Sequence, residues 1–201
     1  MRTAHGFGRL VGFSDGVVAI AITLLVLPLV DAASDYSGDV ASFVLEHMGK
    51  LLVFFLSFAV IGNFWVVHHR MWEQITTYSP GLLWANLLWL LSIVFLPFPT
   101  ALLASSPGGD RATYALYVGT MAVTTLAELI MQWLIVRSPA LQADEVRGTP
   151  ALRGYVISFG IMVLALLIAV VFPDIGLWGL ALFAVAGPVQ NALSRRKKVS
   201  V

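Results

Sequence analysis

The residues best able to do chemistry in this chain lie inside apolar segments. Asp15 follows Ser14 near the start of one apolar run, and two adjacent histidines, His68 and His69, lie near the end of another. A carboxylate within a membrane-spanning helix costs about 3 kcal/mol unless it faces water or a partner. These side chains are therefore candidates for proton transfer, for ion coordination, or for a hydrogen-bonded network between helices.

The elements that must position these residues follow from composition. The chain has 201 residues, 59% of them hydrophobic and only 11% charged, whereas soluble domains are about 25% charged. We predict an all-α integral membrane protein with a single transmembrane domain over residues 1–201. Six segments reach the roughly 20 apolar residues that a spanning helix needs. They are about 10–30, 49–70, 82–104, 112–136, 152–172 and 175–193.

Orientation follows from the basic residues, since those near helix ends are retained in the cytoplasm. With both termini cytoplasmic, only Lys50 and Arg111 of the 12 basic residues lie outside. The cytoplasmic set is Arg2, Arg9, Arg70, Arg137, Arg147, Arg153, Arg195, Arg196, Lys197 and Lys198. The run at 195–198 is interpreted as a topology anchor and a contact for anionic membrane lipid. Nothing indicates a nucleic-acid partner.

The first outer loop is acidic instead. It carries Asp31, Asp35, Asp39 and Glu46. A ring of carboxylates at a pore mouth would enrich cations, although an outer loop also needs polar residues simply for solvation. Both interpretations of the loop remain open.

Partners for Asp15 are available at its own depth. Under this topology Trp65, His68 and His69 lie near the cytoplasmic end of the second segment, and Asn86 lies near the matching end of the third. We favour a structural network of these groups over a proton relay or an ion ligand. Adjacent histidines point about 100° apart on a helix, so they do not form a metal-binding pair, and the absence of cysteine excludes thiolate sites. No metal site or cofactor is expected.

Two further features lie on helix faces. Ile20, Leu24 and Leu27 follow one another at i, i+4 and i+7 and so form one stripe. Composition alone makes it a packing or lipid face; in a pore it would form hydrophobic rings that gate by dewetting. Pro28 should relax the helix just beyond. Glu128, one turn before Gln132, is expected to form interhelical hydrogen bonds or to snorkel.

The run Arg9-Leu-Val-Gly-Phe13-Ser14-Asp15-Gly-Val-Val-Ala-Ile20, continuing to Leu27, resembles the first helix of the transmembrane protein 175 family of potassium channels. The hallmark of that helix is an Arg followed by Phe-Ser-Asp. Two more blocks, 61–70 and 86–100, are similar to prokaryotic members. The last three segments agree only in number and hydrophobicity, so the resemblance is carried by the first half.

This resemblance implies a homotetramer in a bacterial plasma membrane, with one six-helix repeat per chain. Potassium would be the permeant ion and the first helix would line the pore, without the Thr-Val-Gly-Tyr-Gly filter, which is absent here. Ile20 would form the constriction, with Leu24 and Leu27 as further rings. The remaining motif residues would pack helices together: Arg9, Phe13, Ser14 and Asp15 with Trp65, His68 or His69, and Asn86.

Three other functions were weighed. A proton-coupled transporter or proton pathway would use Asp15 and His68 or His69, but such transporters usually contain inverted repeats, and none is evident. An intramembrane hydrolase would need Ser14 and Asp15 in one triad, yet adjacent residues on a helix point in different directions. A non-catalytic scaffold is the third. We therefore expect a channel and not an enzyme.

Overall fold

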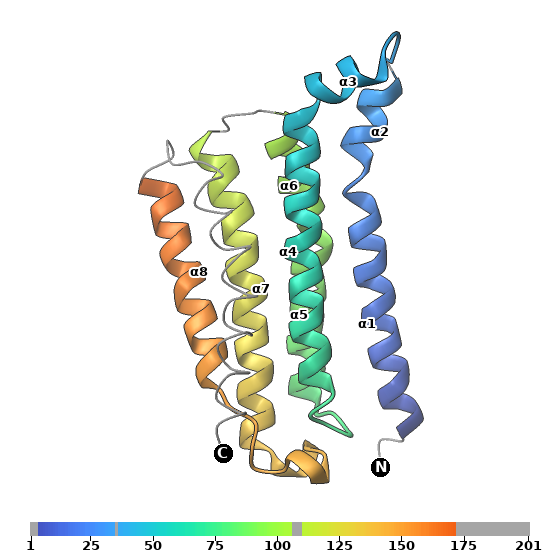
Figure 1. The fold of residues 1–201 in the computed structure, drawn as a ribbon. Coiled ribbons are helices and arrows are strands. Elements are labelled where there is room, and N and C mark those ends of the chain that lie inside the picture. Colours follow the sequence, from blue (N-terminus) through green and yellow to red (C-terminus); the bar gives the residue numbers. More distant parts are fainter. Residues whose placement is uncertain (1–3, 35, 106–109, 172–201) are drawn as a thin grey trace, which may run out of the picture.

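The computed structural model describes residues 4–34, 36–105 and 110–171 as an elongated bundle of helices lying side by side (Figure 1). Five stretches of these residues are helical, long and apolar enough to cross a membrane. They are Gly6–Ser34, Met48–Trp72, Pro80–Ser105, Arg111–Arg137 and Arg153–Val171. They coincide with the first five predicted segments, so an all-helical membrane protein is confirmed. The sixth segment, its turn at Pro173-Asp174 and the basic run at 195–198 lie outside the described residues.

The first span is interrupted. Helix α1 (Ala4–Leu24) ends two residues before α2 (Leu27–Ser34) begins. Pro28 has no N–H, so the carbonyl of Leu24 loses its i+4 donor. The N–H groups of Leu25 and Val26 instead reach the carbonyls of Ile22 and Thr23, both at 3.3 Å. The expected effect of Pro28 therefore takes the form of a tight turn at Leu25 and Val26.

A second interruption, which the sequence reading did not anticipate, divides the third span. Helix α5 (Pro80–Phe95) is separated from α6 (Pro97–Ser105) by Leu96. Pro97 and Pro99 supply no N–H to the preceding turn, which explains the break. The start of α5 is regular: Ser79 caps it by accepting a hydrogen bond from the N–H of Leu82 at 3.2 Å, and Pro80 occupies the first turn.

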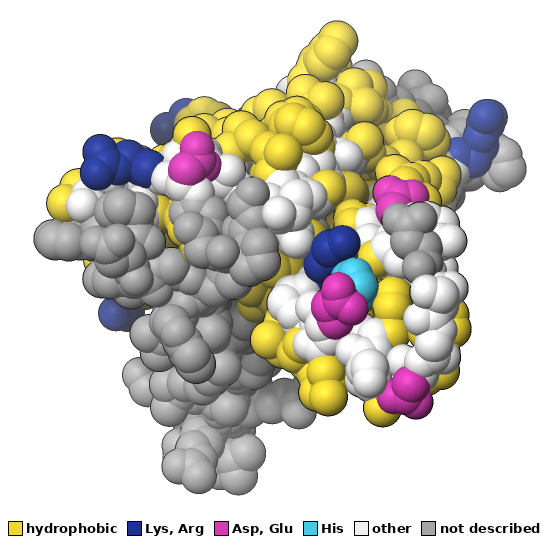
Figure 2. All heavy atoms as spheres, turned by 90° about the horizontal axis from the view of Figure 1, so that it is seen from above, with side chains coloured by type: hydrophobic (Ala, Val, Ile, Leu, Met, Phe, Trp, Pro, Cys, Tyr) yellow, Lys and Arg dark blue, Asp and Glu magenta, His cyan; other side chains and the backbone are white. Residues whose placement is uncertain are grey.

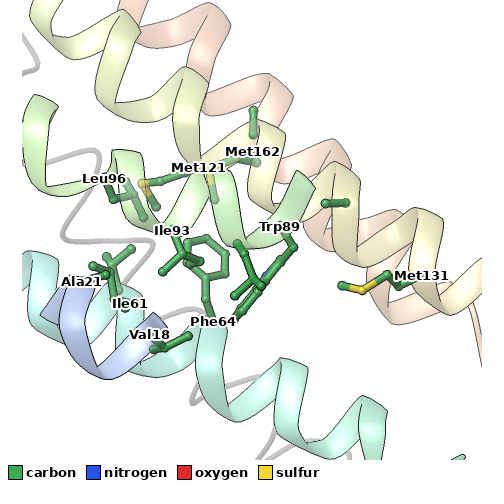
Figure 3. Packing of buried hydrophobic residues seen from close by; sticks show 14 of the residues in the cluster. Val18, Ala21, Ile61, Phe64, Trp89, Ile93, Leu96, Met121, Met131 and Met162 are labelled. Carbon is green, nitrogen blue, oxygen red and sulfur yellow. The ribbon is translucent and has the colours of Figure 1, made fainter. Parts of the chain in front are cut away.

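The core lies where α5 meets its neighbours. Helix α7 (Arg111–Arg137) packs between α5 and α8 (Arg153–Val171), while α4 (Met48–Trp72) and α1 cover α5 and α6 from the other side. Trp89 and Ile93 of α5 are fully buried at the centre, and Figure 3 shows them among side chains from α1, α4, α7 and α8. Helices α1 and α8 form opposite edges of the bundle (Figure 1).

The two ends of the bundle differ in charge. The N-terminal end of α1 shares one end with the α4–α5 turn and the α7–α8 loop (Figure 1). That turn and loop are joined by hydrogen bonds from the N–H of Thr76 to the carbonyl of Leu141, at 3.0 Å, and from the N–H of Ala143 to that of Gln74, at 2.9 Å. The basic residues of this end include Arg70, Arg137, Arg147 and Arg153. This grouping supports the predicted cytoplasmic side.

At the other end, the first outer loop contains a short helix that was not predicted, α3 (Val40–Glu46). Asp39 caps it by accepting a hydrogen bond from the N–H of Ser42 at 2.9 Å, and this bond holds the pKa of the carboxyl below its ordinary value. Figure 2 shows acidic side chains at separate places on this end, with basic side chains beside some of them. Among the described residues the acids are dispersed (Figure 2), so both interpretations of the loop, a cation-enriching rim and simple solvation, remain predictions.

Candidate pore helix and its polar network

Helix α1 presents two different faces. Its packed face carries Ser14, Val18, Ala21 and Leu25, each at most 2% exposed and spaced four, three and four residues apart. That spacing is the period of a helix face pressed against a core. The residues come into contact with α4, α5 and α6. This stripe is the buried centre of the face by which α1 packs against the rest of the chain.

The opposite face is open. Ile20 is 62% exposed, Leu24 38% and Leu27 49%, although all three are large and apolar. The stripe singled out in the sequence is thus not the packing face of the subunit. Because α1 lies at an edge of the bundle (Figure 1), this face is free to meet lipid or other copies of the chain. An exposed apolar face of this kind marks an interaction surface in a soluble protein, and in a membrane it suits lipid, a partner or a pore.

One polar side chain on the open side was not identified from the sequence. Thr23 is exposed, and its hydroxyl donates a hydrogen bond to the carbonyl of Ile20 at 2.7 Å. Threonine is common inside the apolar runs of membrane helices, so its presence alone does not indicate a functional site. Its distance of three residues from Ile20 and four from Leu27 was the available signal.

Behind α1, the motif residues meet side chains from two other helices. The indole Nε1 of Trp65 donates to Oδ1 of Asp15 at 2.8 Å, which links α1 to α4. The amide Nδ2 of Asn86 donates to Oγ of Ser14 at 3.0 Å, which links α1 to α5. The Ser14 hydroxyl in turn donates to the carbonyl of Leu10 at 3.0 Å. The structure therefore brings Ser14, Asp15, Trp65 and Asn86 together.

His68 completes this network from α4. Its Nε2 lies 2.8 Å from Oδ1 of Asn86 and 2.6 Å from Nε1 of Trp72. A single ring nitrogen either donates to Asn86 or accepts from Trp72, so the two contacts compete for one tautomer. The His68 ring also stacks on Trp89 with centroids 3.9 Å apart and planes 11° apart. His68 is 1% exposed, so its ring is shielded from solvent by the described residues.

Three residues expected in the network do not bond to it within the subunit. Arg9 and Phe13 are exposed, Phe13 by 58%. His69 is exposed as well and lies 3.4 Å from the carboxylate of Glu73. Its ring stacks on Trp65, the partner of Asp15, with centroids 5.3 Å apart. The packing role expected for Arg9 and Phe13 therefore stays a prediction, since the described residues give them no bond to this network.

The described residues contain no group of three or more His, Asp or Glu side chains arranged to hold a metal ion. They also place Ser14 and Asp15 on different partners, Ser14 with Asn86 and Asp15 with Trp65. Neither pairs with a histidine in the manner of a nucleophile and its base. These hydrogen bonds hold α1 against its neighbours, and they do not form an arrangement for group transfer.

Replacing Trp65 with phenylalanine tests the tie between α1 and α4. Phenylalanine preserves an aromatic ring beside His69 but removes the donor to Asp15. A hydrogen bond of this kind contributes about 1 kcal/mol, so the midpoint of thermal unfolding should fall by about 3 °C. The measurement is unfolding of the purified protein in detergent. Trp84→Phe is the matched control, because Trp84 is 72% exposed; equal shifts in both variants would contradict the tie.

Comparisons with known proteins identify the family of the chain. Residues 9–97 match the family model described as endosomal/lysosomal potassium channel TMEM175. A potassium channel of Streptomyces collinus is 32% identical over 77% of this chain and 81% of its own length. One from Chamaesiphon minutus is 42% identical over 48% of this chain and 49% of its own length.

The crystal structure of a lysosomal potassium-selective channel TMEM175 homolog from Chamaesiphon minutus superposes with a TM-score of 0.76 at 26% identity. It covers 92% of this chain and 98% of that one. The fold, the motif helix and the extended similarity to the Streptomyces protein agree with one another. The chain therefore belongs to the TMEM175 family, a family of ion channels rather than enzymes.

Proposed function

We propose that the chain is one subunit of a homotetrameric potassium channel in a bacterial plasma membrane, with its pore lined by α1. The constriction is Ile20, and Leu24 and Leu27 form further apolar rings towards the outer end. One observation carries this proposal: three large apolar side chains share an open face of α1, while the opposite face is packed against the subunit. Buried on one side and open on the other, the helix has the arrangement that a pore-lining helix needs.

Several chains are required because each supplies one such helix. A closed ring of identical helices needs rotational symmetry between copies, and a homo-oligomer provides it. The number four comes from the resemblance of the Arg9-to-Leu27 run to single-repeat members of the family. Potassium as the permeant ion is supported by the names of the Streptomyces and Chamaesiphon relatives, both called potassium channels.

Apolar rings can pass potassium only if the ion keeps most of its water. An ion stripped of water against hydrocarbon would find no replacement ligands, and the cost would be prohibitive. The ion therefore crosses Ile20 largely hydrated. Potassium holds its water less tightly than sodium, so it deforms its shell at a smaller cost, and selectivity is modest. The Thr23 hydroxyl adds an oxygen atom on the same open side of α1.

The polar network holds α1 in place while its pore face stays open. Asp15 is engaged by Trp65, and Ser14 by Asn86, on the sides of α1 that meet α4 and α5. Neither lies in the Ile20 stripe. This partnering supports a packing role for Asp15 and His68 and speaks against a proton-coupled transporter that would use them as a relay.

The test is ion flux through the purified protein in liposomes, together with its subunit count by native mass spectrometry. We expect flux that does not saturate with ion concentration, faster for potassium than for sodium, and a mass of four chains. Saturable transport that depends steeply on a proton gradient would favour the transporter instead. A folded tetramer without flux under any gradient would favour a scaffold.

A further inference from the structure

A second polar cluster lies away from the pore helix. Glu128 and Gln132 follow one another by one turn on α7, and they are only 3% and 1% exposed. Helix α7 packs between α5 and α8 and makes its main contacts there rather than with α1. The proposed pore gives these two residues no task. Their burial therefore needs its own explanation.

Glu128 has one hydrogen-bond donor among the described residues. Nε1 of Trp89 donates to its Oε1 at 3.2 Å, and Trp89 is itself fully buried. An ionised carboxylate in such surroundings requires several donors or an opposite charge in contact. A single neutral indole does not provide that. The neutral acid is far less costly to bury, but its O–H then needs an acceptor of its own.

Gln132 has the complementary deficit. Its Nε2 donates to Oε1 of Gln74 and to the carbonyl of Ala151, both at 3.2 Å, so both amide hydrogens are used. Both neighbours are acceptors, which fixes the orientation of the amide group. Its Oε1 is buried and has no hydrogen-bond partner in the part of the chain that the structure describes. A buried acceptor without a donor costs about 1–3 kcal/mol.

The carboxyl group of Glu128, which needs an acceptor, and Oε1 of Gln132, which needs a donor, belong to neighbouring residues on α7. Residues four apart on a helix are surface neighbours, and helical side chains lean towards the N-terminus, so Gln132 leans towards Glu128. We propose that Glu128 and Gln132 form a proton-binding site in the core of each subunit, in which neutral Glu128 donates its O–H to Oε1 of Gln132. One bound proton removes the charge from the carboxyl and supplies the missing donor.

Three titratable or charged groups of the described residues lie around the site, namely His68, Tyr155 and Arg70. On the α4 side, His68 stacks on Trp89 at 3.9 Å. On α8, Tyr155 hydrogen-bonds to Gln74 and lies within electrostatic range of both Glu128 and Arg70. Arg70 is exposed at the cytoplasmic end of α4, where water screens its charge. The bound proton links two side chains of α7, Glu128 and Gln132. Trp89 links the site to α5, and Gln74 links it to the α4–α5 turn.

Infrared spectroscopy reads this proton directly. The chain has four glutamates, and Glu128 is the buried one, because the other three, Glu46, Glu73 and Glu145, are exposed. In protein labelled with 13C at the glutamate carboxyl, we expect the carbonyl stretch of a protonated acid at neutral pH, shifted by the label. Only Glu128 can produce it. A spectrum with glutamate carboxylate bands alone would overturn the proposal, and thermal stability that then rose with sodium or potassium would assign the site to a metal cation.

Two variants test the partner and the assignment. Gln132→Leu should shift the acid band to higher frequency, because its O–H loses the amide acceptor. Glu128→Gln should abolish the band yet keep ion flux, since an amide can accept from Trp89 and donate to Gln132. Glu145→Gln is the matched control and should leave the band unchanged. A band that stays in place in Gln132→Leu would remove Gln132 from the site. The wild-type spectrum decides protonation even if neither variant folds.

Discussion

Replacing Ile20 with alanine is expected to raise potassium flux about tenfold in liposomes that contain the purified protein. The change removes three carbon atoms from the side chain that each copy of the chain would contribute to the proposed ring. A hydrated ion would then deform its water shell less on passing. A barrier lower by about 1.4 kcal/mol corresponds to a tenfold rate. Sodium should gain more than potassium, because the narrow ring is what penalises its tighter shell. The potassium-to-sodium flux ratio should therefore fall.

The matched control is Ile157→Ala. Ile157 is 40% exposed on α8, at the edge of the bundle opposite α1 (Figure 1). Because α8 lies at the edge of the bundle away from the proposed pore helix (Figure 1), the replacement should leave both flux and ion ratio unchanged. If Ile20→Ala assembles normally and behaves like Ile157→Ala, Ile20 is not the constriction. If both variants raise flux equally, the effect arises from general loosening of the bundle.

The position of the helices was predictable from the sequence because length and hydropathy determine it. Asp15 and its partners were predictable for a related reason: antiparallel spans place residues near the same membrane surface at similar depth. A carboxylate at that depth needs a partner, and few polar residues were available. The bonds from Trp65 to Asp15 and from Asn86 to Ser14 use candidates that the sequence had already identified.

The choice between His68 and His69 was not predictable, because it depends on how α4 is rotated about its axis. The rotation buries His68 against Asn86 and Trp89 and leaves His69 exposed. Its determinants are distributed over a whole face of α4, which is hydrophobic on nearly every side. A helix with so little amphipathic pattern carries almost no information about its own orientation.

The polar contacts between the later helices could not be predicted from the sequence either. Ser57 of α4 lies 3.1 Å from the hydroxyl of Tyr117 on α7 and accepts a hydrogen bond from Thr100 of α6 at 3.1 Å. Serine, threonine and tyrosine are ordinary residues in membrane helices, and each has several candidate partners at its depth. The unpaired oxygen of Gln132 arises in the same way. Its Nε2 donates to Gln74 in the α4–α5 turn and to Ala151, two residues before α8, and no described residue donates to its Oε1. Only three-dimensional packing selects them.

Replacing Asn86 with leucine should produce the largest loss of stability in the network. Asn86 is fully buried and connects α1 to α4, since its Nδ2 donates to Ser14 and its Oδ1 lies 2.8 Å from Nε2 of His68. Leucine has a similar volume but neither a donor nor an acceptor. The Ser14 oxygen and the His68 ring would each lose a buried partner, at a combined cost of about 3 kcal/mol. The midpoint of thermal unfolding should fall by on the order of 10 °C.

Asn63→Leu is the control, because Asn63 lies in the same span as His68 but is exposed. It should unfold close to the wild-type temperature. A double-mutant cycle with Ser14→Ala then separates the contact from the general cost of the substitution: once Asn86 is leucine, losing the Ser14 hydroxyl should cost little more. Additive losses in the cycle would mean that Asn86 stabilises the bundle independently of α1. The Asn86–Ser14 bond would then not be what holds α1, and its position would depend on the Trp65–Asp15 bond and on the packing of Val18, Ala21 and Leu25.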